Sequence, residues 1–157
     1  MKIKSKEDIE APIAEVFGAI SDFELMERSA LRRGVELQRT GDLSQPENGL
    51  AWDLNFSFRG KPREIRLTLA SYTPETGLAL TGSGSGSGID GRMEIELLAL
   101  SPQRTRMAVQ LELSPTNLTG RLLVQSLKLA RSKLTSRFKL RLAEFAKFTE
   151  ERLKRTA

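Results

Sequence analysis

The sequence predicts one α+β domain in which a seven-stranded antiparallel sheet precedes a single long C-terminal helix. Residues 118–153 contain no Pro, and no Gly after Gly120, and their apolar residues recur with the period of an α-helix. Between Gly34 and Pro115, by contrast, apolar and polar residues alternate in runs bounded by turn-forming residues. The length of 157 residues is typical of one domain, so 1–157 is expected to fold as one unit.

The N-terminal segment is expected to contain one strand and two short helices. Residues 2–10 alternate crudely between apolar and polar, as in a first strand. A helix is expected over 12–20, because Pro12 suits the first turn of a helix and helically spaced apolar residues follow it. Asp22 is expected to cap a second helix over 22–30.

Six further strands are expected after the second helix. The clearest is 50–58, where apolar side chains occupy every second position and share one face of the strand. These side chains are Leu50, Trp52, Leu54, Phe56 and Phe58. The other five strands are expected over 35–39, 64–69, 78–88, 89–100 and 106–113, with a loop at 41–49 and turns at 59–62 and 74–77.

The segment Gly82–Gly88, with the sequence GSGSGSG, has the composition of a flexible linker. It continues the alternation of Leu78 and Leu80, however, so we expect the end of a strand followed by a hairpin, with the glycines on the inward face. Glycine on an inner face leaves space for a ligand or for another element. Gly84 is therefore predicted to border a cavity.

The long helix carries one apolar stripe that is expected to face the sheet. Its members are Leu123, Val124, Leu127, Ala130, Leu134, Phe138, Leu142, Phe145 and Phe148. Arg131 and Arg141 project within about 40° of the centre of this stripe. Either their stems pack while the guanidinium groups reach water, or the two side chains face a cavity and meet an anionic ligand group or the carboxylate of Glu7.

The composition excludes several kinds of chemistry. Without Cys the chain has no disulfide, thiol nucleophile or thiolate metal site, and without His it lacks the commonest general base and metal ligand. An enzyme would have to rely on groups such as Glu7, Arg131, Arg141 and Tyr72, and Tyr72 shares the outward parity of its strand. We therefore predict no catalytic residues, no metal site and no cofactor.

The net charge of +5 is concentrated in the C-terminal region. Residues 118–157 carry +8 and residues 1–117 carry −3. Such a basic helix is either a solvated outer face or a surface that attracts anionic lipid or an acidic protein. A single Trp and a single Tyr give little support to stacking on nucleic acid, so no nucleic-acid partner is predicted. No signal peptide or apolar run of membrane-spanning length is recognisable, and a cytoplasmic location is expected.

Four short segments, together with the order of the elements, resemble a known superfamily. They are Ile9–Pro12, Glu15–Phe17, Gly91–Ile95 and Arg104–Arg106. The chain resembles the START-like, Bet v 1-like helix-grip superfamily, also called SRPBCC, over essentially its whole length, and it is similar to polyketide cyclase-like and carbon monoxide dehydrogenase accessory-type members. The resemblance implies a curved sheet that grips the C-terminal helix around an apolar cavity. It also implies hydrophobic ligands such as lipids, quinones, sterols or polyketides.

The sequence thus predicts a module that binds or carries a hydrophobic small molecule, of lipid, quinone or polyketide type. The residues predicted to contact it are Trp52, Leu54, Phe56, Leu67, Gly84, Met93, Met107, Arg131, Phe138, Arg141 and Phe145. The apolar members of this set are equally explicable as packed core. Two alternatives stay open: a polyketide cyclase or hydrolase-like enzyme, and an accessory protein that docks on a membrane or an acidic partner through its basic helix.

Overall fold

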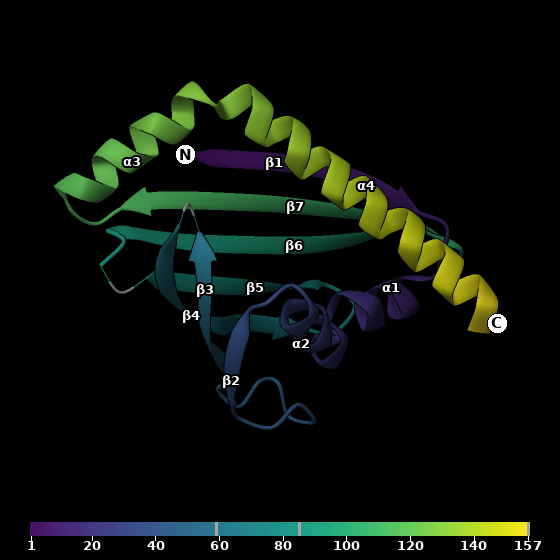
Figure 1. Ribbon diagram of the computed structural model, residues 1–157. Coiled ribbons are helices and arrows are strands. Elements are labelled where there is room, and N and C mark those ends of the chain that lie inside the picture. Colours follow the sequence, from purple (N-terminus) through teal and green to yellow (C-terminus); the bar gives the residue numbers. More distant parts are fainter. Residues whose placement is uncertain (59, 85, 157) are drawn as a thin grey trace.

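In the computed structural model, which describes residues 1–58, 60–84 and 86–156, seven strands form one antiparallel sheet and four helices lie against it (Figure 1). The strands are β1 (Lys2–Ile9), β2 (Glu36–Thr40), β3 (Ala51–Phe58), β4 (Lys61–Thr73), β5 (Gly77–Gly84), β6 (Ile89–Ser101) and β7 (Arg104–Pro115). The helices are α1 (Ile13–Ile20), α2 (Phe23–Arg32), α3 (Leu118–Leu129) and α4 (Arg131–Thr156).

The strand order is β1-β7-β6-β5-β4-β3-β2, so the first strand pairs with the last and the others follow as neighbours in sequence. Hairpins join β3 through β7, as antiparallel pairing allows. The predicted α+β helix-grip fold is confirmed. The helices α1 and α2 lie near one end of the sheet, α3 lies at the other, and α4 runs along β1 between the two ends (Figure 1).

The prediction of a single long helix over 118–153 is wrong in one respect. The chain forms two helices that meet at an angle at Ala130 (Figure 1). The backbone of Ala130 leaves helical geometry at φ −98° and ψ 15°, and its N–H donates to the carbonyl of Leu127 at 3.0 Å. With this break, α3 packs on β7 and β6 while α4 packs on β1. No Pro or Gly marks the position, so the bend is set by tertiary packing and has no sequence signal.

The inward face of α4 also differs from the predicted stripe. Phe148, predicted on the buried stripe, is 52% exposed, whereas its neighbour Thr149 is 1% exposed. The inward positions follow a spacing of three and four residues. They are Phe138, Leu142, Ala146, Thr149 and Leu153.

Tyr72 lies on the inner side of the sheet, which corrects its predicted outward orientation. The register between β4 and β5 shifts between Leu69 and Ser71, which leaves Ala70 as an extra residue. A β-bulge of this kind reverses the parity of every later residue in the strand. The ring of Tyr72 consequently packs edge-on against Phe17, with ring centroids 5.3 Å apart.

The glycine-rich segment is strand and hairpin, as predicted, and not a linker between domains. The strand β5 continues to Gly84, and β6 begins at Ile89 after a turn in which Gly86 and Gly88 adopt positive φ. Ser85 of this segment and Arg59 of the predicted 59–62 turn lie outside the described residues.

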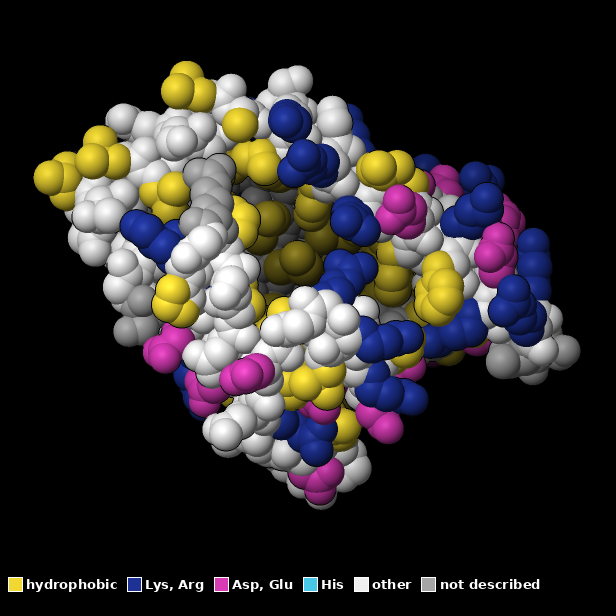
Figure 2. All heavy atoms as spheres, in the orientation of Figure 1, with side chains coloured by type: hydrophobic (Ala, Val, Ile, Leu, Met, Phe, Trp, Pro, Cys, Tyr) yellow, Lys and Arg dark blue, Asp and Glu magenta, His cyan; other side chains and the backbone are white. Residues whose placement is uncertain are grey.

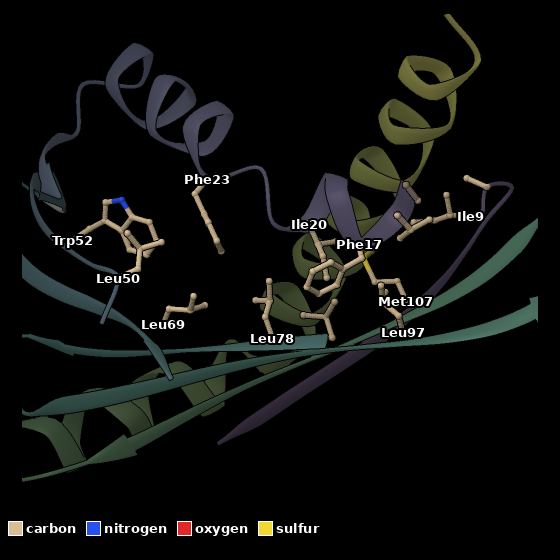
Figure 3. Packing of buried hydrophobic residues seen from close by; sticks show 14 residues of the cluster. Ile9, Phe17, Ile20, Phe23, Leu50, Trp52, Leu69, Leu78, Leu97 and Met107 are labelled. Carbon is tan, nitrogen blue, oxygen red and sulfur yellow. The ribbon is translucent and has the colours of Figure 1, made fainter. Parts of the chain in front are cut away.

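The packed core lies under α1 and α2, at one end of the sheet (Figure 3). Its large side chains are Ile9, Val16, Phe17, Ile20, Phe23, Leu50, Trp52, Leu69, Leu78, Leu97, Met107 and Val109. The C-terminal half of α4 is tied to this end by an ion pair of 3.3 Å between Arg152 and Asp22. Asp22 also caps α2, as predicted, by accepting from the N–H of Leu25. None of the helices described is long and apolar enough to cross a membrane.

Candidate functional site

The inner face of the sheet changes from buried to partly exposed along each central strand. In β4, β5, β6 and β7 the buried residues Leu69, Leu78, Leu97 and Met107 lie at the end covered by α1 and α2 (Figure 3). Towards the opposite end the inward residues are apolar but only partly buried. They are Leu54, Phe56, Ile65, Leu67, Leu80, Met93, Ile95, Leu111 and Leu113 from the strands, with Leu134, Phe138 and Leu142 from α4.

This partly exposed half of the inner face forms a hollow. Figure 2 shows a deep depression with a hydrophobic floor, in the position where Figure 1 places the inner sheet surface between the β3–β4 hairpin and α4. Basic side chains gather on the α4 side of its rim (Figure 2). An apolar concave surface with a charged rim is the usual form of a site for a hydrophobic small molecule.

The glycines of β5 contribute less open space than the sequence predicts. A Cβ on Gly84 would lie 2.5 Å from the hydroxyl oxygen of Ser87, so the inward side of Gly84 is occupied by the hairpin that follows it. A Cβ on Gly82 would lie 3.1 Å from a methyl group of Leu67. Both glycines therefore serve close packing within the sheet, and the prediction that Gly84 borders the hollow is corrected.

The other apolar residues predicted to contact a ligand divide into two groups. Trp52 and Met107 belong to the packed core, where the indole N–H of Trp52 donates to Glu27 at 2.7 Å and the side chain of Met107 is fully buried. The remaining predicted residues are partly exposed, and five of them pack on the margin of that core. These five are Leu54, Leu67, Met93, Phe138 and Phe145, while Phe56 lies further along β3.

Arg131 and Arg141 are both exposed on the surface of α4. The guanidinium group of Arg131 donates to the carbonyl of Lys2 at 3.1 Å, and that of Arg141 lies 3.6 Å from the carboxylate of Glu144. Neither forms the predicted pair with Glu7 among the described residues. Both guanidinium groups reach solvent, as in the first of the two alternatives, but the side chain of Arg141 is 68% exposed, so its stem is largely unpacked.

Arg63 is a candidate that the sequence analysis did not identify. It pairs with Phe56 in the β3–β4 ladder and shares the inward parity of Ile65 and Leu67. Its side-chain Nε is buried and has no hydrogen-bond partner among the described residues. A buried donor without an acceptor is costly unless a further group satisfies it. Extending the alternation of β4 back by two residues from Ile65 would have revealed this arginine.

The outer face of the sheet offers shallow polar depressions instead. The charges that line them are already partly compensated, since Arg66 pairs with Asp53 at 2.9 Å and Arg92 with Glu94 at 2.7 Å. The described residues also contain no cluster of three or more acidic side chains placed to hold a metal ion. The hollow on the inner face is therefore the candidate site.

Comparison with known proteins supports the fold. No family model matches the sequence, and no curated protein is detectably similar to it. Solved structures are similar over almost the whole chain. The Zhui aromatase/cyclase from Streptomyces sp. R1128 is 11% identical, with a TM-score of 0.66 over 98% of this chain and 95% of that one.

Two further structures illustrate the range of proteins with this fold. Norcoclaurine synthase from Thalictrum flavum, solved in complex with dopamine and hydroxybenzaldehyde, is 14% identical, with a TM-score of 0.66 over 96% of this chain and 87% of that one. Ara h 8.0201 is 14% identical, with a TM-score of 0.55 over 89% and 97% of the two chains. At these identities the likeness establishes the helix-grip fold, and a fold alone does not determine function.

Proposed function

We propose that this protein binds a hydrophobic small molecule in the hollow between the open half of the sheet and α4. The observation that carries the proposal is the gradient along β4–β7, in which the inward apolar residues pass from fully buried to partly exposed, with Arg63 as a charged residue at the open end of β4. Side chains on a solvated face of an antiparallel sheet are normally polar. An apolar lining that the protein leaves uncovered is explained by a ligand that covers it.

The solved structures with this fold are consistent with a ligand in such a position. One of them holds dopamine and hydroxybenzaldehyde, and another is an aromatase/cyclase. The present chain shares their fold. A lipid, quinone or polyketide-like ligand remains the predicted class, and the cytoplasmic location stays a prediction.

We further propose that Arg63 binds the polar end of the ligand. Its unpartnered Nε–H requires an acceptor, and a carboxylate or carbonyl oxygen on an otherwise apolar molecule would supply one. Arg63 lies beside Phe56, so an apolar body could rest on the open half of the sheet while its polar end reaches the guanidinium group.

Titration with the apolar fluorescent probe N-phenyl-1-naphthylamine tests the hollow. Wild-type protein should bind the probe, and Met93→Gln, which places an amide on the lining, should weaken binding about five- to tenfold, equivalent to about 1 kcal/mol of lost apolar contact. Met26→Gln on α2 is the matched control, because Met26 is already exposed at the surface. Native mass spectrometry of protein purified from its host should also show a retained apolar molecule. Equal affinities in the two variants, or no probe binding at all, would contradict the proposal.

Competition between decanoate and decanol tests Arg63. Arg63→Met should weaken displacement of the probe by decanoate about tenfold and leave decanol unchanged, because the acid alone loses a charge-assisted hydrogen bond. Arg141→Met is the control, since that side chain is exposed on α4. If Arg141→Met shows the selective loss and Arg63→Met does not, the polar end is bound as the sequence analysis predicted and not by Arg63.

A further inference from the structure

The helix α3 is apolar on two opposite sides. Its inner side, which includes the buried Val124, packs against β6 and β7. On its outer side Leu118, Leu122 and Leu129 are 72%, 61% and 92% exposed. At about 100° per residue these three leucines lie within about 40° of one another, so they form one ridge along the helix.

This leucine ridge projects from the molecule. Figure 1 places α3 at the upper left, beyond the ends of β6 and β7, and Figure 2 shows hydrophobic side chains protruding from the surface in that region. A surface helix normally turns its polar side to solvent. Three large aliphatic side chains on the solvent side of a 12-residue helix therefore indicate a surface that is covered in use.

The segment of the chain that carries the ridge contains only positive charges. Residues 113–143 contain seven Lys and Arg and no Asp or Glu. Two of these cations, Arg121 and Lys128, are exposed on α3 about 80 to 100° from the centre of the ridge. An apolar edge with cations along its flank is the arrangement of helices that lie in the interface of an anionic bilayer.

Other occupants fit this surface less well. A second copy of the chain would bring two sets of cations together, and like charges across an interface oppose association. A protein partner normally seats aromatic side chains or arginine in pockets, whereas this surface is a convex ridge of leucines. A bilayer requires no pocket, since its acyl chains accept the leucines while its headgroups meet the cations.

The ridge is held in a fixed position relative to the sheet. A Cβ on Gly120 would overlap the carbonyl oxygen of Gly88, so the first turn of α3 lies directly against the β5–β6 hairpin. The side chain of Asn117 accepts from the N–H of Gly120 at 2.8 Å and caps the helix. The three leucines are thus presented by a helix that is docked on the body of the protein, at the end of the sheet that carries the hollow.

We propose that the outer face of α3, formed by Leu118, Leu122 and Leu129 with Arg121 and Lys128 on its flank, docks on the surface of an anionic lipid bilayer. The proposal goes beyond ligand binding in the hollow and does not depend on it. Docking in this orientation brings the hollow close to a reservoir of hydrophobic molecules.

Flotation with vesicles tests the docking. Protein should float with vesicles of 70% phosphatidylcholine and 30% phosphatidylglycerol, and much less with phosphatidylcholine alone. The triple variant Leu118→Gln, Leu122→Gln and Leu129→Gln should lose at least about tenfold in partitioning. Leu140→Gln is the matched control, because Leu140 is an exposed leucine on α4 outside the ridge.

The contribution of the cations Arg121 and Lys128 to vesicle binding is tested separately. Arg121→Gln with Lys128→Gln should reduce partitioning about 25-fold, because each cation near an anionic surface contributes about fivefold. The double variant Lys147→Gln with Lys154→Gln, at exposed positions near the end of α4, should change it much less. Circular dichroism confirms that all variants remain folded.

Three results would overturn the proposal. They are failure of the wild-type protein to float with either vesicle, equal flotation of the wild-type protein and the triple leucine variant, and flotation that is independent of phosphatidylglycerol. If light scattering instead shows a wild-type dimer that the leucine variant converts to a monomer, and no vesicle binding, a second copy of the chain covers the ridge.

Discussion

The two ends of the inner sheet face are built from the same strands, yet one is a packed core and the other an open hollow. At the first end, α1 lies over β6 and β7 with Val16, Phe17 and Ile20 buried. At the other end, α3 lies against the ends of the same strands and turns three leucines outwards. Apart from Arg63 at the open end of β4, the inward residues of the central strands are mainly apolar at both ends, so the difference comes from the helices that cover them.

This difference separates stability from binding. A fully buried side chain contributes its transfer free energy and its packing contacts to the native state. A partly exposed side chain contributes less to folding and keeps a surface available for another molecule. We therefore expect substitutions at the packed end to change the free energy of unfolding, and substitutions in the hollow to change affinity.

Two methionines on neighbouring strands give the most direct test. Met107→Ala should lower the free energy of unfolding by about 2 to 5 kcal/mol, because the buried side chain would leave a cavity. Met93→Ala, in the hollow, should cost less than about 1.5 kcal/mol and should weaken binding of the apolar probe. Urea denaturation followed by circular dichroism gives both free energies. Equal costs at the two positions would mean that the hollow is as well packed as the core.

Substitution of one glycine in α3 and one in α1 tests how firmly the helices at the two ends are fixed. Gly120→Ala should destabilise by about 2 to 3 kcal/mol, because its Cβ would overlap the carbonyl of Gly88 and α3 would have to move. Gly18→Ala on α1 is the matched control, since a Cβ there meets nothing within 4 Å and alanine favours the helix by about 0.5 to 1 kcal/mol. Thermal melts of both variants measure the difference. A stable Gly120→Ala variant would show that α3 is not fixed against the hairpin.

Most of the fold could be predicted from the sequence because alternation and helical period are local properties. The alternation in 50–58 and the continuation of Leu78 and Leu80 into the glycine-rich segment predicted strands that the structure contains. The cap at Asp22 followed from its side-chain chemistry alone. Ala130 and Ala70 had no such signal, because a bend and a bulge at alanine are set by contacts with distant residues.

The candidate site was less predictable than the fold. Strand parity identified Leu54, Leu67 and Met93 as inward residues, but it could not show where along a strand the covering helices end. For the same reason the sequence predicted that Trp52 and Met107 contact a ligand, whereas both side chains lie in the packed core. Arg63 has the same strand parity as Ile65 and Leu67, so it could have been predicted as an inward residue in the same way.

Trp52 allows a finer test of the packed end. Its indole N–H donates to Glu27, whose carboxylate also accepts from Arg39 at 2.7 Å. Trp52→Phe should destabilise by about 1 to 2 kcal/mol, because it removes a hydrogen bond to a charged acceptor and part of a buried ring. Urea denaturation measures the loss, and affinity for the probe should stay within about twofold of wild type. A large loss of affinity would place Trp52 in the binding site, as the sequence analysis predicted.

Asp8 offers the smallest effect and tests whether the outer surface adds to the stability of the packed end. A hydrogen bond from Arg106 holds the pKa of the Asp8 carboxyl below its usual value of 3.8, against the opposing effect of desolvation, and the charges of Arg106 and Arg104 lower it further. Because the folded pKa lies below the unfolded one, the stabilisation is present above about pH 4 and is lost as the pH falls through the folded value.

Asp8→Asn should therefore lower the melting temperature slightly at pH 7 and leave it unchanged at pH 2. The side chain of Asp8 is partly exposed to solvent, so 0.5 M NaCl should shrink the difference at pH 7. Asp42→Asn is the control, since the pKa of Asp42 is lowered mainly by the backbone N–H of Ser44 within one loop, and its salt dependence should be weaker. A difference between wild type and Asp8→Asn that persists at pH 2 would show that the amide disturbs the β1–β7 edge by its shape and not by its lost charge.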